Sequence, residues 1–131
     1  MVFVGVLTIV GCKSRCDPDE IFETDIVGSG WLECGDLHTE ADRIEATTCL
    51  EEALDGGVPA YVRLSDDRGV QYLYLDEPGL AGVLGWGGRL GRMGDAVQHY
   101  HPCDAATAID AFASREPINA ECSGSGEKLC P

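Results

Sequence analysis

Residues 39–55 carry apolar side chains at the spacing of a helix. Thr39 suits the N-cap position, acidic residues occupy the first turn, and Gly56-Gly57 follows as a C-terminal stop. The pattern predicts an amphipathic helix that packs on the rest of the chain through a single face. The residues of that face recur three or four positions apart: Ala46, Cys49, Leu50, Ala53 and Leu54.

Residues 59–76 alternate apolar and polar positions, as a strand does when one of its faces is buried. The alternation runs from Ala60 to Ser65 and again from Val70 to Leu75, on either side of a turn sequence that ends at Gly69. Glycine can adopt the positive φ angles of a tight turn. The segment is therefore predicted to form a β-hairpin.

Three shorter segments complete the predicted fold. Residues 83–86 and 96–101 are typical of short strands, and residues 104–114 repeat apolar side chains at helical spacing. Packing helices on one side of a sheet buries the apolar face of each element. We therefore predict an α+β domain in which one main helix packs on an antiparallel sheet of three or four strands. A short second helix and disulfide bonds complete it.

The first eleven residues contain no charged side chain and lead to Cys12. This stretch is too short to cross a bilayer, which takes about 20 residues in a helix, but it matches the apolar region of a signal peptide. A buried N-terminal strand is the alternative interpretation. Such a strand would use four aliphatic side chains: Val2, Val4, Val6 and Ile9.

The sequence Ile9-Val10-Gly11-Cys12 resembles the lipobox of bacterial lipoproteins. The resemblance covers residues 1–16 and implies cleavage after Gly11, with a lipid on the Cys12 thiol that anchors the protein to the membrane. Lys13 follows in place of the Asp that retains lipoproteins in the inner membrane of enteric bacteria, which favours the outer membrane. Because no Lys or Arg precedes Cys12, we expect that the start codon has been placed too late.

Residues 12–30 are predicted to be an acidic tether that joins the lipidated Cys12 to a single globular domain over residues 31–131. Five acidic side chains lie within the nine positions from Asp17 to Asp25. Such a composition favours a solvated chain, because it offers little apolar surface to bury. The alternative is a calcium site, but the spacing is not that of an EF-hand. Its ligands would be Asp17, Asp19 and Asp25.

The composition narrows the range of partners. The chain has 131 residues, 23 of them acidic and 9 basic, and a net charge of −14. This length suits one domain, and a hydrophobic content of 44% is enough for a core. The charge excludes nucleic acid as a partner because no basic patch could neutralise its phosphates. It also opposes adsorption to anionic lipid.

Seven cysteines fit one lipidation site and three disulfides. An exported chain meets an oxidising compartment, and no Cys-x-x-Cys spacing indicates a zinc site. Six cysteines allow 15 pairings, which the sequence leaves open. Local spacing favours Cys122 with Cys130, and Cys49 with Cys103 would tie the main helix to the sheet. The six expected disulfide cysteines are Cys16, Cys34, Cys49, Cys103, Cys122 and Cys130.

Beyond the lipobox, the chain resembles small cysteine-rich exported proteins of Gram-negative soil bacteria such as myxobacteria. The likeness lies in Trp31-Leu-Glu-Cys34-Gly, in the following helix with its Ala and Cys residues, and in the hairpin after it. The resemblance implies a fold and a location but no catalytic residue. Neither a Gly-x-Ser-x-Gly elbow nor a phosphate-binding loop occurs, so an enzyme is not expected and no cofactor is predicted.

The leading hypothesis is a non-catalytic, membrane-tethered module that binds an unidentified partner in the cell envelope. One alternative is a periplasmic metal-binding protein. His99, His101 and Cys103 alternate, so a regular strand would turn all three to one face, and imidazole and thiolate ligands suit zinc or copper. A disulfide at Cys103 would leave two imidazoles, to which His38 or a carboxylate could be added.

A second alternative is an enzyme with its site in the glycine-rich segment 79–94. Arg89 and Arg92 are a basic pair in a very acidic chain, and they could bind an anionic ligand. The plainer interpretation is that they pair with neighbouring carboxylates.

Overall fold

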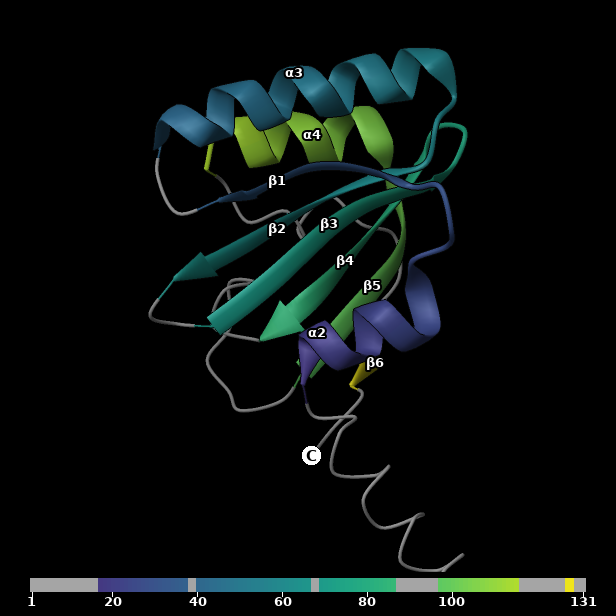
Figure 1. Cartoon of the computed structure of the whole chain (residues 1–131), viewed down its shortest axis with the longest axis vertical. Coiled ribbons are helices and arrows are strands. Elements are labelled where there is room, and N and C mark those ends of the chain that lie inside the picture. Colours follow the sequence, from purple (N-terminus) through teal and green to yellow (C-terminus); the bar gives the residue numbers. More distant parts are fainter. Residues whose placement is uncertain (1–16, 38–39, 67–68, 87–96, 116–126, 129–131) are drawn as a thin grey trace, which may run out of the picture.

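The computed structural model describes residues 17–37, 40–66, 69–86, 97–115 and 127–128. These residues form a sheet with helices on both faces (Figure 1). The strands lie side by side in sequence order. The first two strands pair in parallel and every later neighbour pairs antiparallel. The strands are β1 Leu32–Leu37, β2 Ala60–Asp66, β3 Gly69–Glu77, β4 Leu80–Trp86, β5 Val97–Asp104 and β6 Glu127–Lys128.

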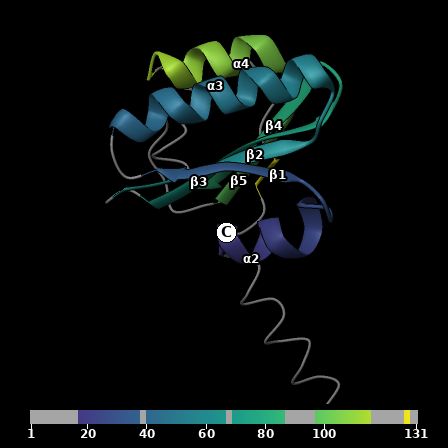
Figure 2. The ribbon, with the colours of Figure 1, turned by 45° about the horizontal axis from the view of Figure 1, so that its top comes forward.

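Two longer helices, α3 (Glu40–Gly56) and α4 (Ala105–Ala113), lie together on one side of the sheet, called here the helix face. The short helix α2 (Pro18–Ile21) continues into the π-helix η1 (Phe22–Ile26) on the opposite side, called here the aromatic face. Figure 2 shows the sheet between these two layers. Helix α3 connects the parallel strands β1 and β2, as a crossover connection must.

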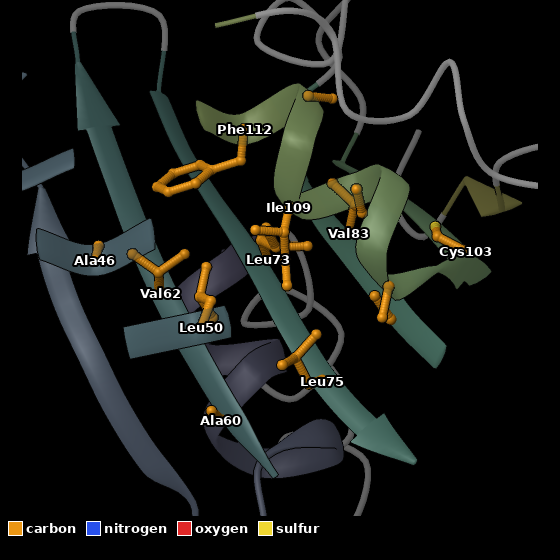
Figure 3. Close-up of a cluster of buried hydrophobic side chains, with 14 of the residues drawn as sticks. Ala46, Leu50, Ala60, Val62, Leu73, Leu75, Val83, Cys103, Ile109 and Phe112 are labelled. Carbon is orange, nitrogen blue, oxygen red and sulfur yellow. The ribbon is translucent and has the colours of Figure 1, made fainter. Parts of the chain in front are cut away.

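The main core fills the space between the helix face and the two longer helices (Figure 3). From α3 it takes Ala46, Leu50 and Ala53, which lie one turn apart on the face that the sequence predicted. Small alanines on both helices let them approach the sheet closely, and Phe112 of α4 fills the space between. The core is almost entirely apolar, which is the main source of stability in a domain of this size.

Side chains near the helix ends join α3 to α4 and cap the start of α4. The Arg43 guanidinium donates to the Phe112 carbonyl at 2.7 Å and lies 4.9 Å from the centre of the Phe112 ring. The Asp104 carboxylate accepts from the Thr107 backbone N–H at 3.0 Å and from its hydroxyl at 2.6 Å. This N-cap starts α4 and holds the pKa of Asp104 below its usual range, chiefly through the two bonds from Thr107.

The predicted α+β class, the main helix, the hairpin and the second helix are confirmed. The predicted sheet is wrong in two respects: it has more strands than three or four, and it is mixed rather than antiparallel. Strand β6 adds one strand to those predicted, and β1 adds another together with the parallel pairing. The sequence of β1 does not alternate apolar and polar residues over its whole length, and its pairing with β2 is shifted between Glu33 and Gly35.

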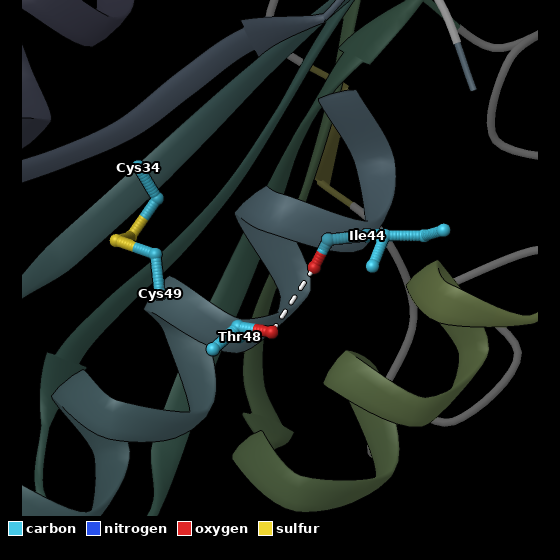
Figure 4. The surroundings of a disulfide bond; sticks show 4 residues. All are labelled: Cys34, Ile44, Thr48 and Cys49. Carbon is cyan, nitrogen blue, oxygen red and sulfur yellow. Dashed lines mark hydrogen bonds between the residues drawn. A yellow bond between two sulfur atoms is a disulfide. The ribbon is translucent and has the colours of Figure 1, made fainter. Parts of the chain in front are cut away.

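A disulfide joins Cys34 of β1 to Cys49 of α3, with the two Cα atoms 5.5 Å apart (Figure 4). The pairing of Cys49 with Cys103 that the sequence suggested as a tie between helix and sheet is therefore wrong. Because α3 crosses directly over the edge strand, the nearest partner of Cys49 is on β1. Cys103 is itself disulfide-bonded and faces the main core. Cys16, Cys122 and Cys130 lie outside the described residues.

The predicted tether is also corrected for the part that the structure describes. Residues 18–26 are helical, and Ile21 and Phe22 are 4% and 2% exposed against the aromatic face. The acidic composition of this segment gave no indication that the adjacent Ile21 and Phe22 would be buried. It also did not indicate that the Asp19 carboxylate would bond to the buried Tyr72. The folded region therefore extends well before residue 31, whereas the predicted signal peptide over residues 1–11 and lipidation at Cys12 lie outside the described residues.

Candidate functional site

Arg63 of β2 is the centre of a hydrogen-bond network that joins β2 to α2, β1 and β3 on the aromatic face. Its Nε and Nη2 atoms donate to the two oxygens of Asp19 in α2, at 2.8 and 2.9 Å. Its Nη1 atom donates to Asp36 of β1 at 3.0 Å. The Tyr72 hydroxyl of β3 donates to the same Asp19 carboxylate at 2.5 Å. A paired guanidinium–carboxylate bond of this geometry is both strong and directional.

These contacts shift the protonation of the groups involved. The hydrogen bonds from Arg63 hold the pKa of Asp19 below its usual range, against an opposing effect of burial. Burial raises the pKa of Tyr72, and the adjacent Asp19 carboxylate raises it further. Tyr72 therefore stays a neutral donor, Asp19 stays ionised, and the docking of α2 is held by charge at neutral pH.

An aromatic cluster continues from this ion pair. Phe22 stacks on Tyr72, with ring centres 4.0 Å apart and an angle of 8° between the rings. Tyr61 and Trp31 border Phe22, at 4.9 and 6.4 Å between ring centres. Aromatic pairs of this kind add stability beyond the area that they bury. The aromatic face is thus a second, smaller core closed by α2 and η1.

Tyr74 crosses the neighbouring strand to reach a histidine. Its hydroxyl lies 2.6 Å from Nε2 of His99, although β4 runs between their two strands. The ring can lie flat across β4 because Gly82 is beneath it, and a Cβ atom at Gly82 would overlap the ring. Burial raises the pKa of Tyr74, with a further contribution from Asp76.

Two irregularities in the sheet bring His101 and Asp76 together. Strand β3 has an extra residue between Leu75 and Glu77, and β5 has one between Tyr100 and Cys103. His101 Nε2 then lies 2.9 Å from one Asp76 oxygen, and the other Asp76 oxygen is buried with no partner among the described residues. A carboxylate that fixes an imidazole is a device of both metal sites and acid–base sites.

The histidines remain on one face but Cys103 does not. The extra residue in β5 turns Cys103 to the helix face, whereas the rings of His99 and His101 lie 6.2 Å apart beside Tyr74. The disulfide at Cys103 also removes its thiolate. Nowhere in the described part of the chain do three metal-ligating side chains gather in a suitable arrangement.

The remaining predicted positions divide into two groups. Asp19 is occupied by Arg63 and Tyr72, and Asp17 caps α2 by accepting from the Asp19 N–H, so the described geometry does not favour the calcium alternative. The other positions lie outside the described residues: Cys12, Cys16, His38, Arg89, Arg92, Cys122 and Cys130.

The outward side of α3 is a separate surface with a uniform charge. Arg43, the only basic residue of this helix, turns toward α4, so the outward side presents carboxylates around Ile44 and Thr48. Ile44 is 71% exposed, the largest value among the bulky apolar side chains that the structure describes. The exposed carboxylates on this side are Glu45, Glu51, Glu52 and Asp55.

The sequence did not identify the residues that organise the aromatic face. Arg63, Tyr72 and Tyr74 were placed on strands by their alternation, but their partners come from segments far away in the chain. The available signal was a basic side chain, Arg63, on the same strand face as Tyr61.

No protein-family model matches this chain, and neither the curated proteins nor the solved structures contain a significant match to it.

Asp19→Asn is expected to weaken the docking of α2 at neutral pH and to have little effect in acid. Because folding lowers the pKa of Asp19, its ionised form adds stability above the ordinary value of 3.8, and that stability is lost as the pH falls through the folded value. The expected cost at pH 7 is about 1 kcal/mol, allowing for partial exposure. Urea unfolding at pH 7 and pH 2.5 measures it. Glu20→Gln, on the exposed side of α2, is the control, and an equal cost at both pH values would contradict the interpretation.

Gly82→Ala is expected to destabilise the fold by about 1–3 kcal/mol because the added methyl group displaces the Tyr74 ring. The same substitution in a Tyr74→Ala background should cost much less, since the ring is then absent. A double-mutant cycle by urea unfolding gives the coupling. Additive effects would show that Gly82 does not serve to accommodate Tyr74.

Proposed function

We propose that this chain is an exported lipoprotein whose folded domain binds a protein partner at the cell envelope and performs no catalysis. The observation that carries the proposal is the lipobox-like Ile9-Val10-Gly11-Cys12, a few residues before a disulfide-bonded domain. A disulfide is compatible with an oxidising compartment outside the cytoplasm. Lys13 supports the outer membrane in preference to the inner. Among the described residues, no helix has the length and hydrophobicity needed to cross a membrane.

The short distance along the chain from Cys12 to α2 supports a defined orientation. Asp17 is five positions after Cys12, and an extended chain spans at most about 3.6 Å per position, or about 18 Å here. A lipid on Cys12 would therefore hold the N-terminus of α2 close to the bilayer. Because α2 lies on the aromatic face, α3 and α4 would be on the other side of the sheet (Figure 2).

The outward side of α3 is the surface that we assign to the partner. It combines exposed carboxylates with the exposed Ile44, and the chain carries a net charge of −14. Such a field attracts a basic surface over a distance and increases the rate of association. A single aliphatic side chain among charges can supply a local apolar contact. The partner is thus expected to present basic residues around an apolar position.

Intact-mass measurement on protein from native membranes tests the anchor. We expect a chain beginning at Cys12 that carries the mass of attached acyl chains, with six further thiols that react with an alkylating reagent only after reduction. Cys12→Ser should abolish the lipid mass and release the protein from the membrane fraction. A chain that retains residues 1–11 without lipid, or that has reactive thiols before reduction, would overturn the proposal.

Site-specific cross-linking tests the partner surface. A photo-reactive residue at Thr48, in the middle of the outward side of α3, is expected to capture a defined protein in intact envelopes. Reversing the nearby charges with Glu51→Lys and Glu52→Lys should reduce that product several-fold, because the electrostatic attraction is lost. Thr24, exposed on η1, is the matched control position. Equal capture from Thr24, or capture unaffected by the reversal, would contradict the assignment.

A further inference from the structure

Residues 17–26, called here the strap, are held on the aromatic face by side chains alone. Among the described residues, no hydrogen bond between backbone atoms joins the strap to the sheet. Two large apolar side chains, Ile21 and Phe22, are buried there, and the Asp19 carboxylate supplies the polar contact. The strap can therefore leave the aromatic face without breaking the pairing of any strand.

The sheet keeps the surface under the strap in shape without help from the strap. Arg63 donates through Nη1 to Asp36 of β1 at 3.0 Å, a bond that does not involve the strap. The Tyr74 ring is held by the contact of its hydroxyl with His99 at 2.6 Å and by the space over Gly82. Binding to side chains that are already fixed loses less conformational entropy. We call this surface the strap site and define it by Arg63, Tyr61, Tyr72 and Tyr74.

The strap site has two parts, which recognise two chemical groups. Arg63 and Tyr72 direct three hydrogen bonds at the carboxylate of Asp19. The Phe22 ring stacks on Tyr72 at 4.0 Å between ring centres, and the other two tyrosines of the site border it at 4.9 and 5.9 Å. Asp19 and Phe22 are three positions apart in helical backbone, which brings their side chains to the same side of the helix. The site therefore selects a carboxylate and an aromatic ring at this spacing.

The charge of the strap does not suit the domain that it covers. The strap carries five carboxylates and no basic side chain, in a chain with a net charge of −14. Burial raises the pKa of Tyr61, and the carboxylates of Glu33 in β1 and Glu23 in the strap raise it further, so these two like charges act on the same hydroxyl. Repulsion of this kind weakens the docking of the strap. A segment with the same carboxylate and ring but with basic residues around them would bind the strap site more strongly.

We propose that the strap site binds a segment of a partner protein that presents a carboxylate and an aromatic ring one helical turn apart, flanked by basic side chains. The strap occupies the site in the absence of that partner and competes with it. Residues 27–31 connect the strap to β1 and include Gly28 and Gly30, the latter with φ of 83°. This connection lets the strap move aside while β1 stays paired. The inference is separate from the proposed function, since it needs neither a lipid on Cys12 nor the outward side of α3.

Binding of a synthetic peptide to the purified full chain tests the proposal. The fluorescent peptide has the sequence of residues 17–26 with three carboxylates replaced by Lys, while Asp19 and Phe22 are kept. In the chain, Asp19→Ala with Phe22→Ala removes the two groups through which the strap competes. Fluorescence anisotropy should show that this variant binds the peptide about tenfold more tightly than the unmodified chain does. The replacements in the peptide are Glu20→Lys, Glu23→Lys and Asp25→Lys.

Two controls separate recognition from general charge attraction. A peptide with the same lysines but with Asp19→Asn and Phe22→Ala is more positive and should nevertheless lose most of the binding. In the chain, Glu20→Ala with Thr24→Ala changes exposed positions of the strap and should leave binding as in the unmodified chain. Hydrogen exchange supplies a measurement without substitutions, because excess peptide should speed the exchange of residues 17–26 in the unmodified chain. Circular dichroism checks the fold of each variant.

A folded Asp19→Ala, Phe22→Ala variant that binds the peptide no better than the unmodified chain would overturn the inference. Equal binding of the control peptide would overturn it too, since charge attraction alone would then explain the result. Equal binding of the unchanged acidic sequence of residues 17–26 would contradict the requirement for basic flanks and assign the site to a second copy of this chain. If the variant does not fold, unchanged hydrogen exchange of residues 17–26 at saturating peptide overturns the inference. None of these outcomes affects the proposed anchor or the partner surface on α3.

Discussion

The ion pair between Arg63 and Asp19 is the constraint on which the two-sided architecture depends. Segment 18–26 buries only two large apolar side chains, Ile21 and Phe22, and its other side is acidic. Such a segment would stay solvated without a partner for its charge. Arg63 supplies that partner, Tyr72 completes it, and Phe22 is then placed on the ring of Tyr72. The aromatic core, the position of α2 and the proposed orientation at the membrane all follow from this contact.

The two faces of the sheet use different means to order their side chains. The helix face is apolar and is shaped by the close approach of α3 and α4, so it depends on packing. On the aromatic face, hydrogen bonds cross from strand to strand. Tyr74 spans β4 over Gly82, and two extra residues in the strands bring Asp76 to His101. Irregular strands of this kind redirect side chains and are frequent near functional sites.

Local patterns predicted the elements whose structure is decided locally. The main helix, the hairpin and the second helix were predicted because period and capping residues agree within one segment. Strand β1 could not be predicted in this way, because it is held in the sheet by parallel pairing with β2, which follows only after the whole of α3. The partner of Cys49 and the role of Asp19 share that difficulty. Each depends on a residue brought close by tertiary packing, and an acidic side chain that will be paired looks the same in sequence as one that is solvated.

If the chain is anchored through Cys12 as proposed, the disulfide between Cys34 and Cys49 has a mechanical consequence. Tension applied through residue 17 reaches α2 and η1 first, and these are held on the sheet by one ion-pair network and a few aromatic contacts. That segment can peel away while the sheet and the helix face stay intact. The next covalent restraint along the chain is the disulfide of Cys34, which joins β1 to α3. A pull would therefore first extend the chain between residue 17 and Cys34. The disulfide would stop this extension before the force reaches the main core.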